Sequence, residues 1–207
     1  MWPWAGSSDP PGVRPAAAAA LAAALAVGSP AAAAAQAGGT VSQQRALERA
    51  FPDPADVERR TAYLDSASLA RAREMAGSRV EIEQTVVTHY VGVRGDSALG
   101  VAYFDAHRVR TLPEVLMIVV TPEGRVDRVE VLKFSEPPDY RPPEGWLEEF
   151  RGRELSPELA RGRGIVNVTG ATLTSRSVTR AVRRTLALHA VIDPLGRGDG
   201  PDEGGRR

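Results

Sequence analysis

Four hydroxyl groups lie within one short segment of the chain, Thr169-Gly170-Ala171-Thr172-Leu173-Thr174-Ser175. The apolar stripe of a helix follows this segment, and Thr or Ser just before a helix is a typical N-cap. The free N–H groups and the positive dipole end of a helix N-terminus also attract phosphate. Gly170 and the small Ala171 let a ligand approach the backbone. The segment is therefore either a phosphate-binding turn or an ordinary capped helix with a surface face of arginines.

The composition excludes several kinds of chemistry. The 207 residues include no cysteine, which excludes disulfides, thiolate nucleophiles and cysteine-bound metals or haem. Lys133 is the sole lysine, and its Val-Leu-Lys-Phe context fits neither a phosphate-binding loop nor a Schiff base. The three histidines show no metal-ligand spacing. The 26 basic and 26 acidic side chains balance, which gives no reason to expect nucleic acid as a partner. Any redox chemistry would then come from a cofactor held by hydroxyls and backbone groups.

Residues 1–37 are predicted to be a secretory signal peptide. An uncharged, alanine-rich stretch follows Arg14, is broken by Gly28 and Pro30, and ends in the A-x-A cleavage pattern Ala35-Gln36-Ala37. The alternative is an uncleaved anchor, because the stretch is just long enough to span a bilayer. We expect an exported protein, periplasmic or at the cell surface, with membrane association left open. Cleavage removes one charge of each sign, so the mature chain stays balanced.

The remaining chain divides by periodicity into three parts. Residues 38–78 form a predicted N-terminal helical segment, with a helix over 55–76 that ends at Gly77. Residues 79–193 form the main domain, and the Gly/Asp/Arg-rich residues 194–207 are predicted to be a disordered tail.

The main domain begins with four predicted strands. They cover residues 80–91, 98–104, 115–121 and 126–134, with turns at Gly95-Asp96 and Pro122-Glu123-Gly124-Arg125. The continuous apolar run 115–121 is typical of a central, buried strand. We expect an α+β fold: an antiparallel sheet of about four to five strands with helices packed on one side.

The second half of the domain carries loops and a long helix. A proline-rich loop spans 135–143, a short amphipathic helix is expected at 146–150, and residues 162–164 form a flexible joint. In the long helix after Ser175, an apolar stripe faces inward. Four arginines are expected on its solvated face: Arg176, Arg180, Arg183 and Arg184.

The hydroxyl-rich segment resembles the flavinylation motif of the FMN-binding domain family, whose core is Ser/Thr-Gly-Ala-Thr/Ser. That family includes covalently flavinylated components of the Rnf-type and Nqr-type ion-translocating redox complexes. The resemblance extends over roughly residues 85–190, through the hairpin at 122–125, the strand 129–132, the pair Glu136-Pro137, and the segment 146–152. The chain departs from the family at Val166, where an Asp is common, and in the loop 136–140.

The resemblance implies that FMN is joined through its phosphate to a threonine hydroxyl. It implies a separate exported flavin transferase as partner, which uses FAD and a divalent metal. Carried over residue by residue, the acceptor is Thr172, with Thr174 as the nearest rival. The other residues expected at the cofactor are Thr169, Gly170, Ala171, Leu173, Glu136 and Trp146. Tyr140, Trp146 and Phe150 are equally candidates for stacking on the flavin and for ordinary core aromatics.

The implied role is electron transfer by an exported flavoprotein and not conversion of a substrate, so no residue is assigned as catalytic. Its redox partner is unidentified, and whether that partner is membrane-bound stays open. Two alternatives remain. Val166 in place of Asp keeps open a non-covalent FMN-binding or regulatory module. The second alternative is an unrelated secreted structural domain with a well-capped helix.

Overall fold

The computed structural model describes residues 43–160 and 164–196. The predicted signal peptide, most of the predicted tail and the predicted joint at 162–164, apart from Gly164, lie outside the described residues. No helix within the described ranges is long and apolar enough to cross a membrane.

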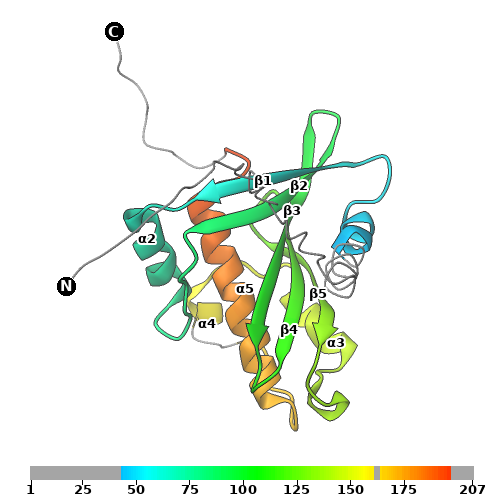
Figure 1. The fold of residues 1–207 in the computed structure, drawn as a ribbon, viewed down its shortest axis with the longest axis vertical. Helices are drawn as coiled ribbons and strands as arrows, with labels where there is room; N and C mark the ends of the chain where they lie inside the picture. Colours follow the sequence, from blue (N-terminus) through cyan, green and yellow to red (C-terminus); the bar gives the residue numbers. More distant parts are fainter. Residues whose placement is uncertain (1–42, 161–163, 197–207) are drawn as a thin grey trace, which may run out of the picture.

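Five antiparallel strands form a single sheet in which each strand lies beside the next one in sequence (Figure 1). The strands are β1 Asp56–Tyr63, β2 Val86–Arg94, β3 Ser97–Arg108, β4 Pro113–Val120 and β5 Val126–Phe134. Residues 95–96 form the turn between β2 and β3, and Gly124, at φ +81°, takes part in the turn between β4 and β5. The α+β class, the strand count and both turns are as the sequence predicts.

The strand β4 separates two apolar clusters, because successive side chains of a strand point to opposite faces of the sheet. Leu116, Ile118 and Val120 contribute to the larger cluster, which lies under the long helix. Met117 and Val119 contribute to a smaller one, which includes Leu47 and Phe51 from the helical residues 43–50 and just beyond them. Helices therefore cover parts of both faces of the sheet, whereas the sequence led us to expect them on one side.

The prediction of one helix over residues 55–76 is wrong in its first half. Residues 56–63 form β1, which pairs along its length with β2 from Asp56 opposite Val93 to Tyr63 opposite Val86. Only α2 Ser66–Ala76 is helical, and Asp65 caps it by accepting a hydrogen bond from the Ser68 N–H at 2.7 Å. An edge strand with both faces largely exposed has no apolar alternation to distinguish it, and β1 is exposed along almost its whole length.

The other helices are short, except for the last. They are the 3-10 turns Pro138–Tyr140 (η1) and Glu148–Phe150 (η2), then α3 Glu144–Leu147, α4 Pro157–Ala160 and α5 Thr172–Ile192. Helix α5 runs along the sheet, with α2 beside it (Figure 1). It begins at Thr172, inside the hydroxyl-rich segment and not after it. The whole first turn of α5 is thereby built from that segment.

Candidate functional site

Helix α5 begins without a side-chain cap. Its N-cap residue is Ala171, and Gly170 before it has φ +84°, a conformation that favours glycine. The backbone N–H groups of Thr172, Leu173 and Thr174 have no hydrogen-bond acceptor among the described residues. The N-terminus of this 21-residue helix therefore presents free donors together with its positive dipole end. The alternative of an ordinary hydroxyl-capped helix is wrong for this segment.

Two of the four hydroxyls of the segment are buried and donate to backbone carbonyl oxygens. The Thr174 hydroxyl donates to the carbonyl oxygen of Tyr140 at 2.7 Å, and the Ser175 hydroxyl donates to that of Ala171 at 3.0 Å. Both residues are buried, with Thr174 only 1% exposed. Thr172 is partly exposed, and its hydroxyl makes a longer contact of 3.3 Å to the carbonyl oxygen of Val168. Thr169 is exposed. Thr169 and Thr172 are thus the two hydroxyls in the segment that a ligand can reach.

Trp146 supports the chain that leads into α5. Its indole Nε1 donates to the carbonyl oxygen of Val166 at 2.6 Å, and its ring packs edge-on against Phe150. Both rings are buried, so they act as core aromatics in the described structure. The side chains of Val166 and Leu173 are 68% and 48% exposed, which leaves apolar surface on both sides of Thr172 in sequence.

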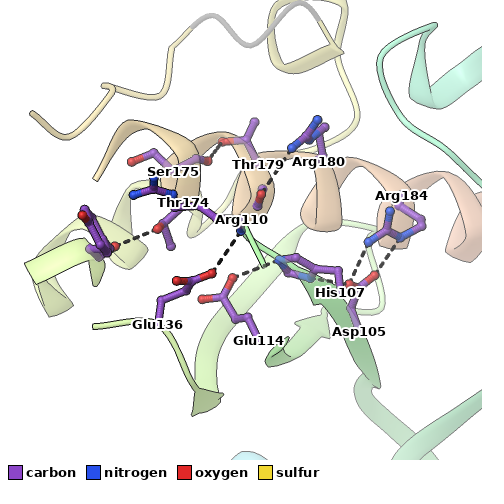
Figure 2. Close-up of polar contacts among 12 residues, drawn as sticks. Asp105, His107, Arg110, Glu114, Glu136, Thr174, Ser175, Thr179, Arg180 and Arg184 are labelled. Carbon is purple, nitrogen blue, oxygen red and sulfur yellow. Dashed lines mark hydrogen bonds and ion pairs between the residues drawn. The ribbon is translucent and has the colours of Figure 1, made fainter. Parts of the chain in front are cut away.

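Glu136 holds the loop between β3 and β4. Its Oε1 accepts hydrogen bonds from the backbone N–H groups of Thr111 and Leu112, each at 2.9 Å, and of Arg110 at 3.3 Å. These N–H groups hold the pKa of Glu136 below its usual range. The guanidinium of Arg110 lies 4.9 Å from the ring centre of Tyr140, whose carbonyl accepts from Thr174. Figure 2 shows Glu136 and Arg110 near the first turn of α5.

A buried charge network that the sequence did not reveal lies farther along α5 (Figure 2). Arg184 donates from Nε and Nη2 to the two carboxylate oxygens of Asp105, at 2.8 and 2.7 Å. His107 Nδ1 contacts Asp105 Oδ1 at 2.9 Å, and His107 Nε2 lies 2.9 Å from Glu114 Oε2. Glu114 is completely buried. The network ties α5 to β3 and β4.

The network shifts the pKa values of two of its members. Burial alone would lower the pKa of His107, but the hydrogen bonds and charges of Asp105 and Glu114 outweigh it and raise the pKa to about 9. Burial would raise the pKa of Asp105, but hydrogen bonds from His107 and Arg184 lower it to about 2. At neutral pH the network therefore holds the His107 imidazolium and the Arg184 guanidinium against the buried carboxylate of Asp105.

The prediction that Arg176–Arg184 form a solvated face is wrong for two of the four arginines. Arg176 and Arg180 are exposed, but Arg183 is only 4% exposed and donates from Nη2 to the carbonyl oxygen of Ala76. Arg184 is engaged in the network above. Helical spacing alone did not reveal that α2 and β3 offer acceptors to this side of α5.

The third histidine is part of the core and not a simple helix-end residue. His189 Nδ1 lies 2.9 Å from the hydroxyl of Tyr103, and the His89 ring also stacks on Tyr103. Burial lowers the pKa of His189 to about 4 and also lowers that of His89. This cluster is neutral at neutral pH.

Comparison with known protein families identifies the region that contains this site. Residues 113–187 match the family model of the FMN-binding domain. The match begins at β4 and ends within α5, so it includes the whole hydroxyl-rich segment. FMN is the cofactor that this family indicates. No curated protein matches the chain.

The start of α5 fits the phosphate of FMN. Free backbone N–H groups and the helix dipole are the donors that a phosphate requires, and here no side chain of the described residues occupies them. A side chain placed on Gly170 would meet nothing within 4 Å, so the space beside the turn is open. Thr169 and Thr172 add accessible hydroxyls. These residues would hold the phosphate end of the cofactor, while Val166 and Leu173 offer apolar surface next to it.

Proposed function

We propose that this protein is an exported electron-transfer flavoprotein that carries FMN covalently, as a phosphoester on Thr172. One observation carries the assignment: the uncapped first turn of α5, with a reachable threonine hydroxyl at its first helical position. An N–H-rich helix start stabilises phosphate, and a covalent bond retains the cofactor outside the compartment in which it is made. FMN, when bound, supplies reversible one- and two-electron transfer.

The choice of Thr172 over Thr174 is supported by burial and hydrogen bonding. A hydroxyl that attacks a phosphorus atom must be reachable by a second protein, the flavin transferase. Thr174 is buried and its hydroxyl is engaged by Tyr140, whereas Thr172 is partly exposed and its one intramolecular contact is long. Thr169 is also reachable, but it precedes the helix and so lies outside the turn whose N–H groups are free.

The residues of this chain would position the acceptor and the phosphate in the attachment reaction. The oxygen of Thr172 would bond to the flavin-side phosphorus of FAD while the phosphoanhydride bond breaks and AMP leaves, and the hydroxyl proton passes to the transferase or to water. The free N–H groups of the first turn would stabilise the negative charge on the phosphoryl oxygens. Trp146 would hold the preceding segment in place through Val166.

Co-expression with a flavin transferase tests the proposal. The protein is then denatured, separated by electrophoresis and examined for flavin fluorescence, and its intact mass is measured. We expect a mass increase of one FMN less one water in the wild type and in Thr174→Ser, and no increase in Thr172→Ala. A transferase that modifies a known acceptor in the same cells but leaves the wild-type protein unmodified would contradict covalent attachment.

A second candidate function is a module that binds FMN without a covalent bond. Val166 favours it, because this exposed valine lies where the flavinylation motif that the segment resembles commonly has an aspartate. In that case the flavin would co-purify with the native protein but separate from it on denaturation. Export follows in both cases from the predicted signal peptide, and it is tested by fractionating cells that express the full chain.

A further inference from the structure

A second cationic feature lies along α5, from Arg176 near its start to Arg183 farther along. A groove of about 650 Å³ is lined by four arginines, Arg79, Arg176, Arg180 and Arg183, together with the polar side chains of Asn167 and Thr179. Among the described residues, no aspartate or glutamate lines this groove. A hollow of this size is typical of small-ligand sites.

The four guanidinium groups lack counter-charges. None of them forms an ion pair with an aspartate or glutamate in the part of the chain that the structure describes. Glu81 lines an adjoining hollow, which shares Arg79 and Arg180 with the groove, but it is paired with neither. Within the described ranges, the side-chain hydrogen bonds that the four donate run from Arg180 to the Ser177 hydroxyl at 3.2 Å and from Arg183 to Ala76.

Arg183 is the arginine of the groove whose charge is buried most deeply. Only 4% of it is exposed, and its Nε has no hydrogen-bond partner among the described residues. Burial, together with the positive charges of Arg79 and Arg180, lowers the pKa of Arg183. Burying a charge without a partner is costly, and gathering like charges around it adds to that cost. An anion in the groove would remove both costs.

Helix geometry explains how the arginines converge. Arg176, Arg180 and Arg183 follow one another at intervals of four and three residues, so they project from one side of α5. Arg79, in the segment after α2, also lines the groove. Arg183 is eleven residues beyond Thr172, which is about 16 Å along the helix axis. A phosphate on Thr172 therefore cannot reach the buried end of the groove.

We propose that this groove is a separate binding site for a diphosphate-class anion, free or as part of a small ligand. A single phosphate group carries about 1.5 to 2 negative charges at neutral pH, so two linked groups match four guanidiniums best. Arginine is the residue best suited to bind phosphate through paired hydrogen bonds. A concave site with one arginine at its buried end fits a small anion better than the surface of an acidic protein. The site does not depend on FMN attachment at Thr172.

Calorimetric titration of the flavin-free full chain with pyrophosphate tests this site. At fixed ionic strength, we expect saturable binding that is tighter than the binding of orthophosphate. Arg79→Gln and Arg180→Gln should each weaken pyrophosphate binding at least ten-fold, because each removes one charged donor from the groove. Neither change should disturb the fold, since both residues are exposed and neither forms an ion pair within the described residues. Arg71→Gln, an exposed arginine on α2 outside the groove, is the matched control and should bind as the wild type does.

Four outcomes would overturn the proposal. The first is no saturable binding at millimolar pyrophosphate, and the second is orthophosphate binding as tight as pyrophosphate binding. The third is that the two groove variants bind pyrophosphate as tightly as the wild type does. The fourth is displacement of pyrophosphate by a hexaglutamate peptide, which would assign the groove to an acidic protein. Thr172→Ala separates this site from the proposed function. It should abolish the FMN adduct while leaving pyrophosphate binding unchanged, and loss of both would contradict the separation of the two sites.

Discussion

The hydroxyl of Thr174 donates a 2.7 Å hydrogen bond to the carbonyl oxygen of Tyr140, which joins the start of α5 to the proline-rich loop. The Thr174 hydroxyl is thereby engaged in an intramolecular hydrogen bond, although Thr174 lies only two residues from the proposed acceptor, Thr172. The two threonines share a sequence motif but differ in environment, since Thr172 stays partly exposed.

Thr174→Val should lower stability without preventing flavin attachment. The substitution keeps the shape of the side chain but leaves the buried Tyr140 carbonyl without its donor, which costs about 1–3 kcal/mol. Thr172→Val removes only a long contact and should change stability by less than about 0.5 kcal/mol. Urea denaturation of both flavin-free variants measures the difference. Equal stabilities would show that the Tyr140 contact contributes little.

Breaking the Arg184–Asp105 pair should be among the most damaging single changes in the domain. Arg184→Met leaves the buried carboxylate of Asp105 with His107 as its remaining partner, and removing one member of a buried pair costs about 3–5 kcal/mol. The matched control is Arg151→Met, which breaks the exposed pair with Glu148 and should cost less than about 1 kcal/mol. Urea denaturation again provides the measurement. A loss for Arg184→Met no larger than that of the control would contradict the role of the network.

The protein should lose stability as the pH falls from about 6.5 to about 4. Burial lowers the pKa of His189 to about 4 in the folded state, so in this window the unfolded chain binds the proton more readily and gains population. The His89 pKa is lowered as well, so both residues act in the same direction. Denaturation of the wild type at several pH values between 4 and 7, compared with His189→Gln, measures the effect. The variant should have a smaller slope, and an equal slope would exclude His189 as its source.

Raising the pH should weaken the charge network. The pKa of His107 is raised to about 9, so its imidazolium stabilises the folded state fully below about 6.5, and that contribution is lost as the pH rises through 9. The titration of His107, followed by NMR in the folded protein, should therefore have a midpoint well above that of an exposed histidine. Arg184→Met leaves both carboxylates beside His107 and should leave this midpoint high, whereas Glu114→Gln should lower it. An ordinary midpoint in the wild type would contradict the contacts with Asp105 and Glu114.

The sequence was sufficient for the parts of the fold that carry a strong pattern. The apolar run of β4, the turns at Gly95-Asp96 and Gly124, and the inward stripe of α5 all produce local signals, and the structure contains each of them. The edge strand β1 produced none, because its pairing with β2 is a long-range property of the backbone and its side chains are mostly exposed.

For the site, the sequence located the hydroxyl-rich segment but not the state of its hydroxyls. Whether Thr174 is free or committed depends on a carbonyl 34 residues away, on Tyr140. The Asp105–His107–Glu114–Arg184 network and the arginine groove were missed for the same reason, since their members come from strands, a loop and a helix that only the fold brings together. No spacing rule connects Arg79 with Arg183.

The most direct measurement is the position of the flavin on the chain. The protein, co-expressed with a flavin transferase, is digested with trypsin, and the flavin-bearing peptide is sequenced by tandem mass spectrometry with a fragmentation method that preserves phosphoesters. We predict that the mass of FMN less one water lies on Thr172 and on no other residue. A phosphoester on Thr174 or Thr169, or a wild-type peptide without flavin beside an active transferase, would contradict the assignment.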